Sequence, residues 1–274
     1  QRLPFSDIAW LKRNGCEDIL IQEQKNRFAI LKSKYESSDY PDDSLSSPLY
    51  AILQKLEKKL RLEPAELAWL KETKIQTRGG ERRLFFSRIL KTYHKIEAVF
   101  YEKEYKLTKN QWHLHTACIH WLSANKGRKI IKLTDKLNFI KESKLMSALL
   151  TLRGEAFRDI RDFEAAVQCV RQAIKFQPGN HQAYTLMSVL CYEQGDYSTG
   201  DSWFGEAMKR GASPEDLDTE IKRVLRKANK EKCRRIVDYL LKKDSARYQW
   251  AEPLPNQTRK EMAQTFAAVD ETVQ

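Results

Sequence analysis

Two stretches of the chain share one pattern at a spacing of 34 residues. Residues 161–178 read RDFEAAVQCVRQAIKFQP, and residues 195–212 read GDYSTGDSWFGEAMKRGA. A repeat of this length is typical of stacked helix pairs, because one pair cannot bury its apolar face alone. The repeat therefore predicts an all-α array. The positions that align are Asp162 with Asp196, Phe163 with Tyr197, Ala166 with Gly200, and Ala173 with Ala207.

A small residue upstream of each copy extends the alignment. Gly154 aligns with Ser188, where the first helix of a pair is expected to meet the second, so nothing larger is expected to fit there. With this residue, the Asp-aromatic turn, the small residues of the second helix and Pro178, the chain resembles the tetratricopeptide repeat family, which has the same period. The resemblance implies a superhelix whose concave groove binds extended peptides or partner helices.

A few positions depart from the family's pattern. Arg153 and Met187 stand where the family usually has Leu, and Ala212 replaces the closing Pro. The late aromatic residue of the first helix is Phe157 in one copy but Cys191 in the other. The two copies cover about a quarter of the chain. The scaffold is therefore better supported than any particular binding surface.

The remainder of the chain is also expected to be helical, with a C-terminal capping pair after the repeats. Glycine and proline number only ten and eight, and no convincing alternating strand is present. Short turns between the later helices favour antiparallel packing of neighbours. A long helix is expected earlier, from about 81 to 107, after a basic loop with two glycines. The later helices are expected near 144–159, 162–176, 181–194, 197–210, 214–229 and 231–243.

Composition suggests where the chain divides. The stretch ESSDYPDDSLSSP is rich in Ser and Asp and poor in core-forming residues, which is typical of a linker or mobile loop. The expected organisation is an N-terminal helical segment at 1–36, this linker at 37–48, a basic helical region at 49–143, tetratricopeptide-like repeats with capping helices at 144–243, and a tail at 244–274.

The positive charge is concentrated in the middle of the chain. The net charge is +12, and residues 48–144 alone contain 22 basic and 10 acidic residues. Such a region attracts nucleic acid, an acidic protein or an anionic surface, although a solvated lysine-rich face is an equally ordinary explanation. No named nucleic-acid motif accompanies it. The candidate nucleic-acid-binding residues are Arg78, Arg82, Arg83, Arg88, Lys91 and Lys95.

The general class is a globular cytoplasmic protein without a membrane segment. No stretch approaches the ~20 uninterrupted apolar residues of a membrane span, and the N-terminus lacks the apolar core of a signal peptide. The five cysteines form no CxxC pair and suggest a reducing compartment. The chain lacks an initiating Met, so we expect it to be part of a longer product, whose catalytic domain, if one exists, lies elsewhere.

A cluster of metal-ligating residue types occurs in WHLHTACIHW. It contains His113, His115, Cys118 and His120. On a helix, His113 and His120 share a face but lie roughly 10 Å apart along the axis, while the other two point elsewhere. A tetrahedral zinc site needs all four ligands to converge at about 2.0–2.3 Å. We therefore expect packing or partner-contact histidines, and neither a metal nor a cofactor.

One motif could carry catalysis. Arg88 and His94 are separated by five residues, which resembles the motif of the HEPN ribonuclease family, in which His would act as acid or base and Arg would stabilise phosphate charge. The polar residue usual after the Arg is Ile89 here. No phosphate-binding loop, dinucleotide fingerprint or nucleophile elbow is present. We therefore expect no enzymatic activity within this chain, with a HEPN-like ribonuclease as the least favoured alternative.

The sequence favours a scaffold or adaptor that binds a partner protein, or another domain of the same polypeptide, within a larger complex. The alternative is a nucleic-acid-binding subunit that uses residues 48–144. Partner contacts are expected at exposed positions on the first helices of the repeats. These candidate residues are Arg153, Glu155, Tyr184 and Glu193.

Overall fold

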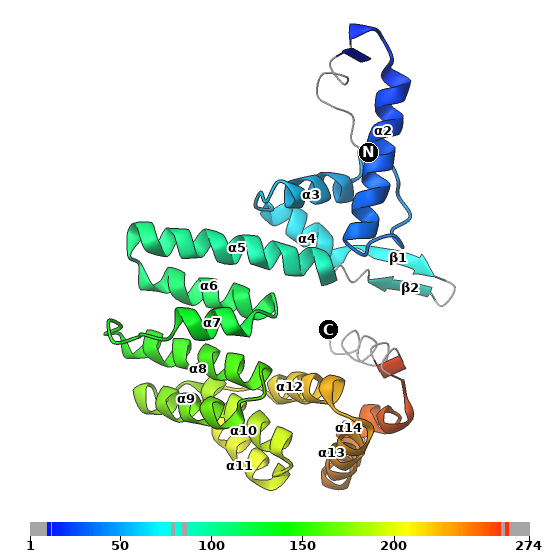
Figure 1. Cartoon of the computed structure of the whole chain (residues 1–274). Helices are drawn as coiled ribbons and strands as arrows, with labels where there is room; N and C mark the ends of the chain where they lie inside the picture. The colour runs from blue at the N-terminus through cyan, green and yellow to red at the C-terminus, as the bar shows by residue number, and fades with distance from the viewer. Residues whose placement is uncertain (1–9, 12, 78–79, 84–86, 259–260, 263–274) are drawn as a thin grey trace. The chain divides into compact units, whose positions relative to one another are not determined.

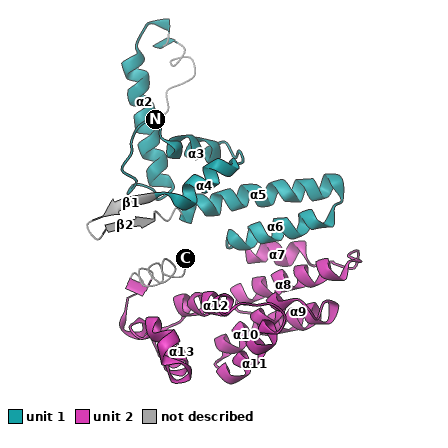
Figure 2. Ribbon diagram, turned by 180° about the vertical axis from the view of Figure 1, so that it is seen from behind, with its two compact units in different colours: residues 1–125 teal, residues 126–274 magenta. Residues whose placement is uncertain are grey.

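The computed structural model describes residues 10–11, 13–77, 80–83, 87–258 and 261–262. The chain divides into two compact units, residues 1–125 and residues 126–274 (Figure 2). Both units are built mainly from helices, which confirms the all-α class (Figure 1). None of the helices in the described ranges combines the length and the apolar character needed to cross a bilayer.

The first unit contains five described helices and one short hairpin. Helix α5 packs along α6, to which a two-residue turn connects it. Pro48 and Pro64 occupy the first turns of α3 and α4, where a missing N–H costs nothing. The elements are α2 (Glu17–Lys34), α3 (Pro48–Glu57), α4 (Pro64–Glu72), β1 (Lys74–Thr77), β2 (Gly80–Arg83), α5 (Ser87–Thr108) and α6 (Gln111–Ser123).

The hairpin corrects the expected start of the long helix. Residues 80–83 form a strand that pairs antiparallel with β1, with Lys74 opposite Arg83 and Thr77 opposite Gly80. The described part of helix α5 begins at Ser87. The pairing of residues 80–83 with β1 replaces the helical start expected at 81.

Aliphatic and aromatic residues of α2, α3, α4 and α5 form the core of the first unit. The expected stripe on α3 faces this core, and Leu49, Ile52 and Leu53 are fully buried. The segment between α2 and α3 folds back on α2, because the ammonium group of Lys32 donates to the carbonyl of Tyr40 and lies 2.7 Å from the carboxylate of Asp43.

The second unit is a succession of antiparallel helices. Every end of the six helices expected from the spacing falls within two residues of the observed end. Side chains cap five of these helices at their N-termini, from Asp162, Asn180, Asp196, Ser213 and Asn229. The elements are α7 (Gly127–Leu133), α8 (Ser143–Asp159), α9 (Phe163–Phe176), α10 (His181–Gln194), α11 (Tyr197–Met208), α12 (Pro214–Lys227), α13 (Lys230–Lys243) and α14 (Ser245–Tyr248), followed by 3-10 turns at Gln249–Ala251 and Leu254–Asn256.

The two copies of the sequence repeat are two helix pairs, α8 with α9 and α10 with α11. Asp162 accepts a hydrogen bond from the amide of Ala165, and Asp196 accepts one from the amide of Thr199. A β-carbon on Gly154 would lie 3.0 Å from Val170 and 3.3 Å from the carbonyl of Ala166. The close approach of α8 and α9 that was expected at this glycine is therefore confirmed.

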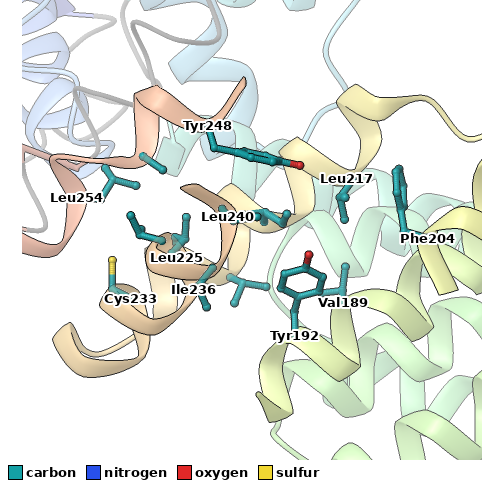
Figure 3. Packing of buried hydrophobic residues seen from close by; sticks show 14 of the residues in the cluster. Val189, Tyr192, Phe204, Leu217, Leu225, Cys233, Ile236, Leu240, Tyr248 and Leu254 are labelled. Atoms are coloured by element: carbon teal, nitrogen blue, oxygen red, sulfur yellow. The ribbon is translucent and has the colours of Figure 1, made fainter. Parts of the chain in front are cut away.

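One buried cluster of the second unit joins α10 and α11 to the helices that follow them. In Figure 3, Tyr192 and Val189 of α10 lie beside residues of α12 and α13 such as Leu217 and Leu240. Residues after 244, which the sequence assigned to a tail, contribute Tyr248, Ala251 and Leu254 to the same cluster. The capping helices therefore close the array through a core that they share with α10 and α11.

Candidate functional site

The basic row expected on α5 is present on its surface. Arg88, Lys91 and Lys95 are all exposed, at the i, i+3 and i+7 spacing of one helix face. Among the described residues, no acidic group forms an ion pair with Lys91 or Lys95. These two lysines can therefore offer positive charge to a ligand.

Arg88 differs from the two lysines because its charge is already paired. Its guanidinium Nη1 lies 2.6 Å from the carboxylate of Glu36, which follows α2. Of the other three candidates, Arg78 lies outside the described residues. Only the backbone of Arg82 and Arg83 is described, as part of β2. The described side chains of the basic site are therefore two lysines without ion-pair partners and one paired arginine.

The candidate residues on the array were expected to be exposed, and that expectation is wrong. Tyr184 is only 5% exposed, and the guanidinium of Arg210 lies 4.0 Å from its ring centroid. Arg153 is half-buried and donates to the carbonyl of Ile131 and to the hydroxyl of Thr134. Helices α8 and α10 have neighbours on both sides, so few of their positions remain open.

Glu155 and Glu193 belong to an ion network centred on Arg158. The Arg158 side chain is 1% exposed, and its guanidinium donates at 2.9 Å to Glu193 and at 2.9 Å to Glu220. Arg223 of α12 lies 3.2 Å from Glu155. The network therefore joins α8, α10 and α12.

The charges within this network shift one another's pKa values. Burial lowers the pKa of Arg158, but the neighbouring carboxylates of Glu155, Glu193 and Glu220 outweigh it, so the pKa lies above its ordinary value. Burial raises the pKa of Glu155, and the nearby Glu220 raises it further. A partner that used these side chains would have to replace contacts already made within the array.

Sequence reasoning overlooked Arg158, although a signal was available. Arg158 and Glu193 are 35 residues apart, one residue more than the repeat. Opposite charges at nearly equivalent positions of adjacent repeats indicate a contact between those repeats. Applied to the first helices, this criterion would have identified Glu193 as an internal partner of Arg158.

A histidine pair connects α5 to α6. The Nδ1 atoms of His94 and His120 lie 2.9 Å apart, and the ring of Tyr101 stacks on His120 with centroids 5.7 Å apart. Burial and the neighbouring His120 lower the pKa of His94 to about 4, and burial lowers the pKa of His120. Both rings are therefore neutral near pH 7, so one can donate to the other.

The other members of the WHLHTACIHW cluster have separate environments. His113 lies 3.1 Å from the hydroxyl of Thr108, and Cys118 is buried, which raises its pKa to about 12. Within the part of the chain that the structure describes, no three His, Cys, Asp or Glu side chains are grouped so as to hold a metal ion. The cluster therefore contributes to packing between α5 and α6.

The two residues of the HEPN-like motif contact different elements. Arg88 pairs with Glu36 after α2, whereas His94 faces His120 on α6. The structure therefore gives each a separate local role and does not join them in one site.

Comparisons of the chain with protein-family models, curated proteins and solved structures found no match.

Proposed function

We propose that the chain is a non-catalytic scaffold or adaptor that binds a partner protein, or another domain of the same polypeptide, within a larger complex in the cytoplasm. The observation that supports this proposal is the pair of equivalent helix hairpins, α8–α9 and α10–α11, with matching Asp caps. We take them as tetratricopeptide-like repeats. Arrays of this kind act through extended surfaces. The five free cysteines fit a reducing compartment.

The surface of the array that remains open differs from the one expected. Phe176 and Met208 lie at the ends of α9 and α11 and are 45% and 47% exposed. Exposed apolar side chains at the last residues of successive second helices provide contact area that costs little to desolvate. We therefore propose that these second-helix ends contribute to partner binding.

The test is capture of a partner followed by reconstitution. The immobilised chain is incubated with nuclease-treated extract of its native host at low and high salt, and the retained protein is identified, purified and titrated against the chain. We expect binding to survive nuclease treatment and to weaken in the variant Phe176→Ser/Met208→Ser.

The matched control is Ile19→Ser/Ile30→Ser, which changes two exposed apolar residues of α2. It is expected to leave the affinity unchanged. A chain that retains no stoichiometric protein partner, or whose partner is lost on nuclease treatment, would contradict the proposal.

A nucleic-acid-binding role is the second candidate, and the free lysines Lys91 and Lys95 favour it. Phosphate contacts make affinity fall steeply with salt. Charge reversal of Arg82, Arg83, Arg88 and Lys91 together should then abolish binding to a random single-stranded oligonucleotide. Binding that is unaffected by this change dismisses the candidate.

A further inference from the structure

The first unit contains an open pocket of about 610 Å³ between α2, the end of α3 and the middle of α5. Its floor is aliphatic and aromatic: Leu56 comes from α3, while Ile96, Val99 and Phe100 come from α5. Val99 is 43% exposed, so this floor is accessible to a ligand. The volume lies within the range of ligand pockets.

Positive charge surrounds this floor. Five cationic side chains and one carboxylate, that of Glu57, line the pocket. Lys34 pairs with Glu57, and Arg61 pairs with Glu97 through two hydrogen bonds of 2.8 Å. The three remaining cations are Lys59, Lys95 and Lys103, and within the described part of the chain none of them has an acidic partner at ion-pair distance.

The side of the pocket formed by Arg61 and Phe100 is held in place before any ligand binds. Glu97 is buried and fixes Arg61, whose guanidinium lies 3.8 Å from the ring centroid of Phe100. Lys59 has a φ of 56°, and the amide of Leu60 donates to the carbonyl of Lys55 to close α3. Lys59 therefore lies in the left-handed turn that ends α3. Preorganisation of this kind favours binding.

We propose that this pocket binds an acidic segment of a partner protein. One aliphatic side chain of that segment would rest on Val99 and Ile96, and flanking carboxylates would pair with Lys59, Lys95 and Lys103. Charge complementarity supports this occupant, because three cations without acidic partners among the described residues line the rim and the floor has no charged side chain. The site lies wholly within the first unit and does not depend on the proposed role of the array.

The floor favours a peptide over single-stranded nucleic acid. Bases bind such proteins by stacking on open aromatic faces. Here Arg61 already covers Phe100, and the hydroxyl of the buried Tyr35 donates to Glu57. The remaining floor is aliphatic, which suits Leu, Ile or Met better than a base.

The test uses a random peptide library displayed on phage and selected on the immobilised full-length chain at low ionic strength. We expect the enriched peptides to carry Asp or Glu on both sides of an aliphatic residue. The best peptide is then synthesised with a fluorescent label, and its affinity is measured by anisotropy. Reversal of two pocket cations, Lys95→Glu/Lys103→Glu, is expected to weaken binding roughly tenfold or more.

Two further variants separate the pocket from general charge. Lys106→Glu/Lys132→Glu makes the same change in net charge at exposed positions outside the pocket, and is expected to change affinity less than about twofold. Val99→Asp places a carboxylate on the floor and should weaken binding as strongly as the double reversal. Circular dichroism checks that each variant remains folded.

Three results would overturn the proposal. They are enriched peptides without acidic residues, equal loss in the pocket and control variants, and displacement of the peptide by an oligonucleotide whose own binding depends on Lys95 and Lys103. Measurement of the same peptide on Phe176→Ser/Met208→Ser separates the two proposals, since that variant should bind it normally.

Discussion

Gly200 is a single residue on which the contact between α10 and α11 depends. A β-carbon at this position would lie 2.6 and 2.8 Å from ring atoms of Tyr192. That ring cannot move aside easily, because it is 1% exposed and its hydroxyl donates to Asp201 at 2.6 Å. We expect Gly200→Ala to lower the free energy of unfolding by about 1–3 kcal/mol, measured by urea denaturation.

A second glycine of α11 provides the control. A β-carbon on Gly205 would meet no atom within 4 Å, and Ala is favoured over Gly in a helix interior by roughly 0.5–1 kcal/mol. Gly205→Ala should therefore raise the stability. If both substitutions changed the free energy of unfolding in the same direction, the contact with Tyr192 would not be the reason that position 200 requires glycine.

Between elements, the histidine pair makes the contact of α5 with α6 sensitive to acid. The folded pKa of His94 is about 4, below its ordinary value of 6.5. The unfolded chain therefore binds its proton first as the pH falls, and stability should decline from about pH 6.5 to about pH 4. Because the ring is only half-buried, solvent screening limits the effect to about 1 kcal/mol.

The variant His94→Phe tests this dependence, because it retains a ring but cannot titrate. The free energy of unfolding, measured by urea denaturation across that window, should vary less steeply with pH than in the wild type. An unchanged slope would show that protonation of His94 is not coupled to unfolding.

The ion network is expected to stabilise the packing of α8, α10 and α12. Arg158→Met leaves Glu155, Glu193 and Glu220 close together without their shared partner, and breaking a buried pair in this way costs about 3–5 kcal/mol. The loss, measured by denaturation, should shrink in acid as the carboxyl group of Glu155, whose pKa is raised by burial, becomes protonated.

Lys227 serves as the comparison for Arg158. Its side chain is 53% exposed and pairs with Asp159 at the edge of the same network. Lys227→Met should cost less than about 1 kcal/mol. Equal losses of stability in Arg158→Met and Lys227→Met would show that burial does not make the Arg158 contacts stronger.

Prediction from sequence succeeded where local spacing decides the structure. The apolar spacing and the turn residues located all six helices from α8 to α13, and the small residues at 154 and 166 indicated the contact of α8 with α9. It failed where contacts outside the helical pattern decide. The hairpin competed with a helical start at 81, and the burial of Tyr184 depends on contacts with α11 that no local pattern records. The pocket could not be foreseen either, because α2, α3 and α5 meet only in the folded unit.

In the whole molecule, each unit has a buried cluster of its own, one around Leu49, Ile52 and Leu53 and one around Tyr192, Ile236 and Leu240. Units with separate cores can open separately. We expect Gly200→Ala to accelerate hydrogen exchange in peptides from α10 to α13 and to leave those from α3 unchanged, as measured by mass spectrometry. Equal acceleration in both units would mean that the chain unfolds as one cooperative structure.

The bond between Arg158 and Glu220, which lie far apart in the sequence, has a mechanical consequence. In most helical repeat arrays each repeat touches only its neighbours, so a pulled array can lose one repeat at a time. Here one guanidinium in α8 holds Glu220 in α12, 62 residues further along the chain. Under tension from the C-terminal end, α12 cannot detach before that bond breaks. Force spectroscopy of this unit should therefore record one large rupture in the wild type and a series of smaller ones in Arg158→Met.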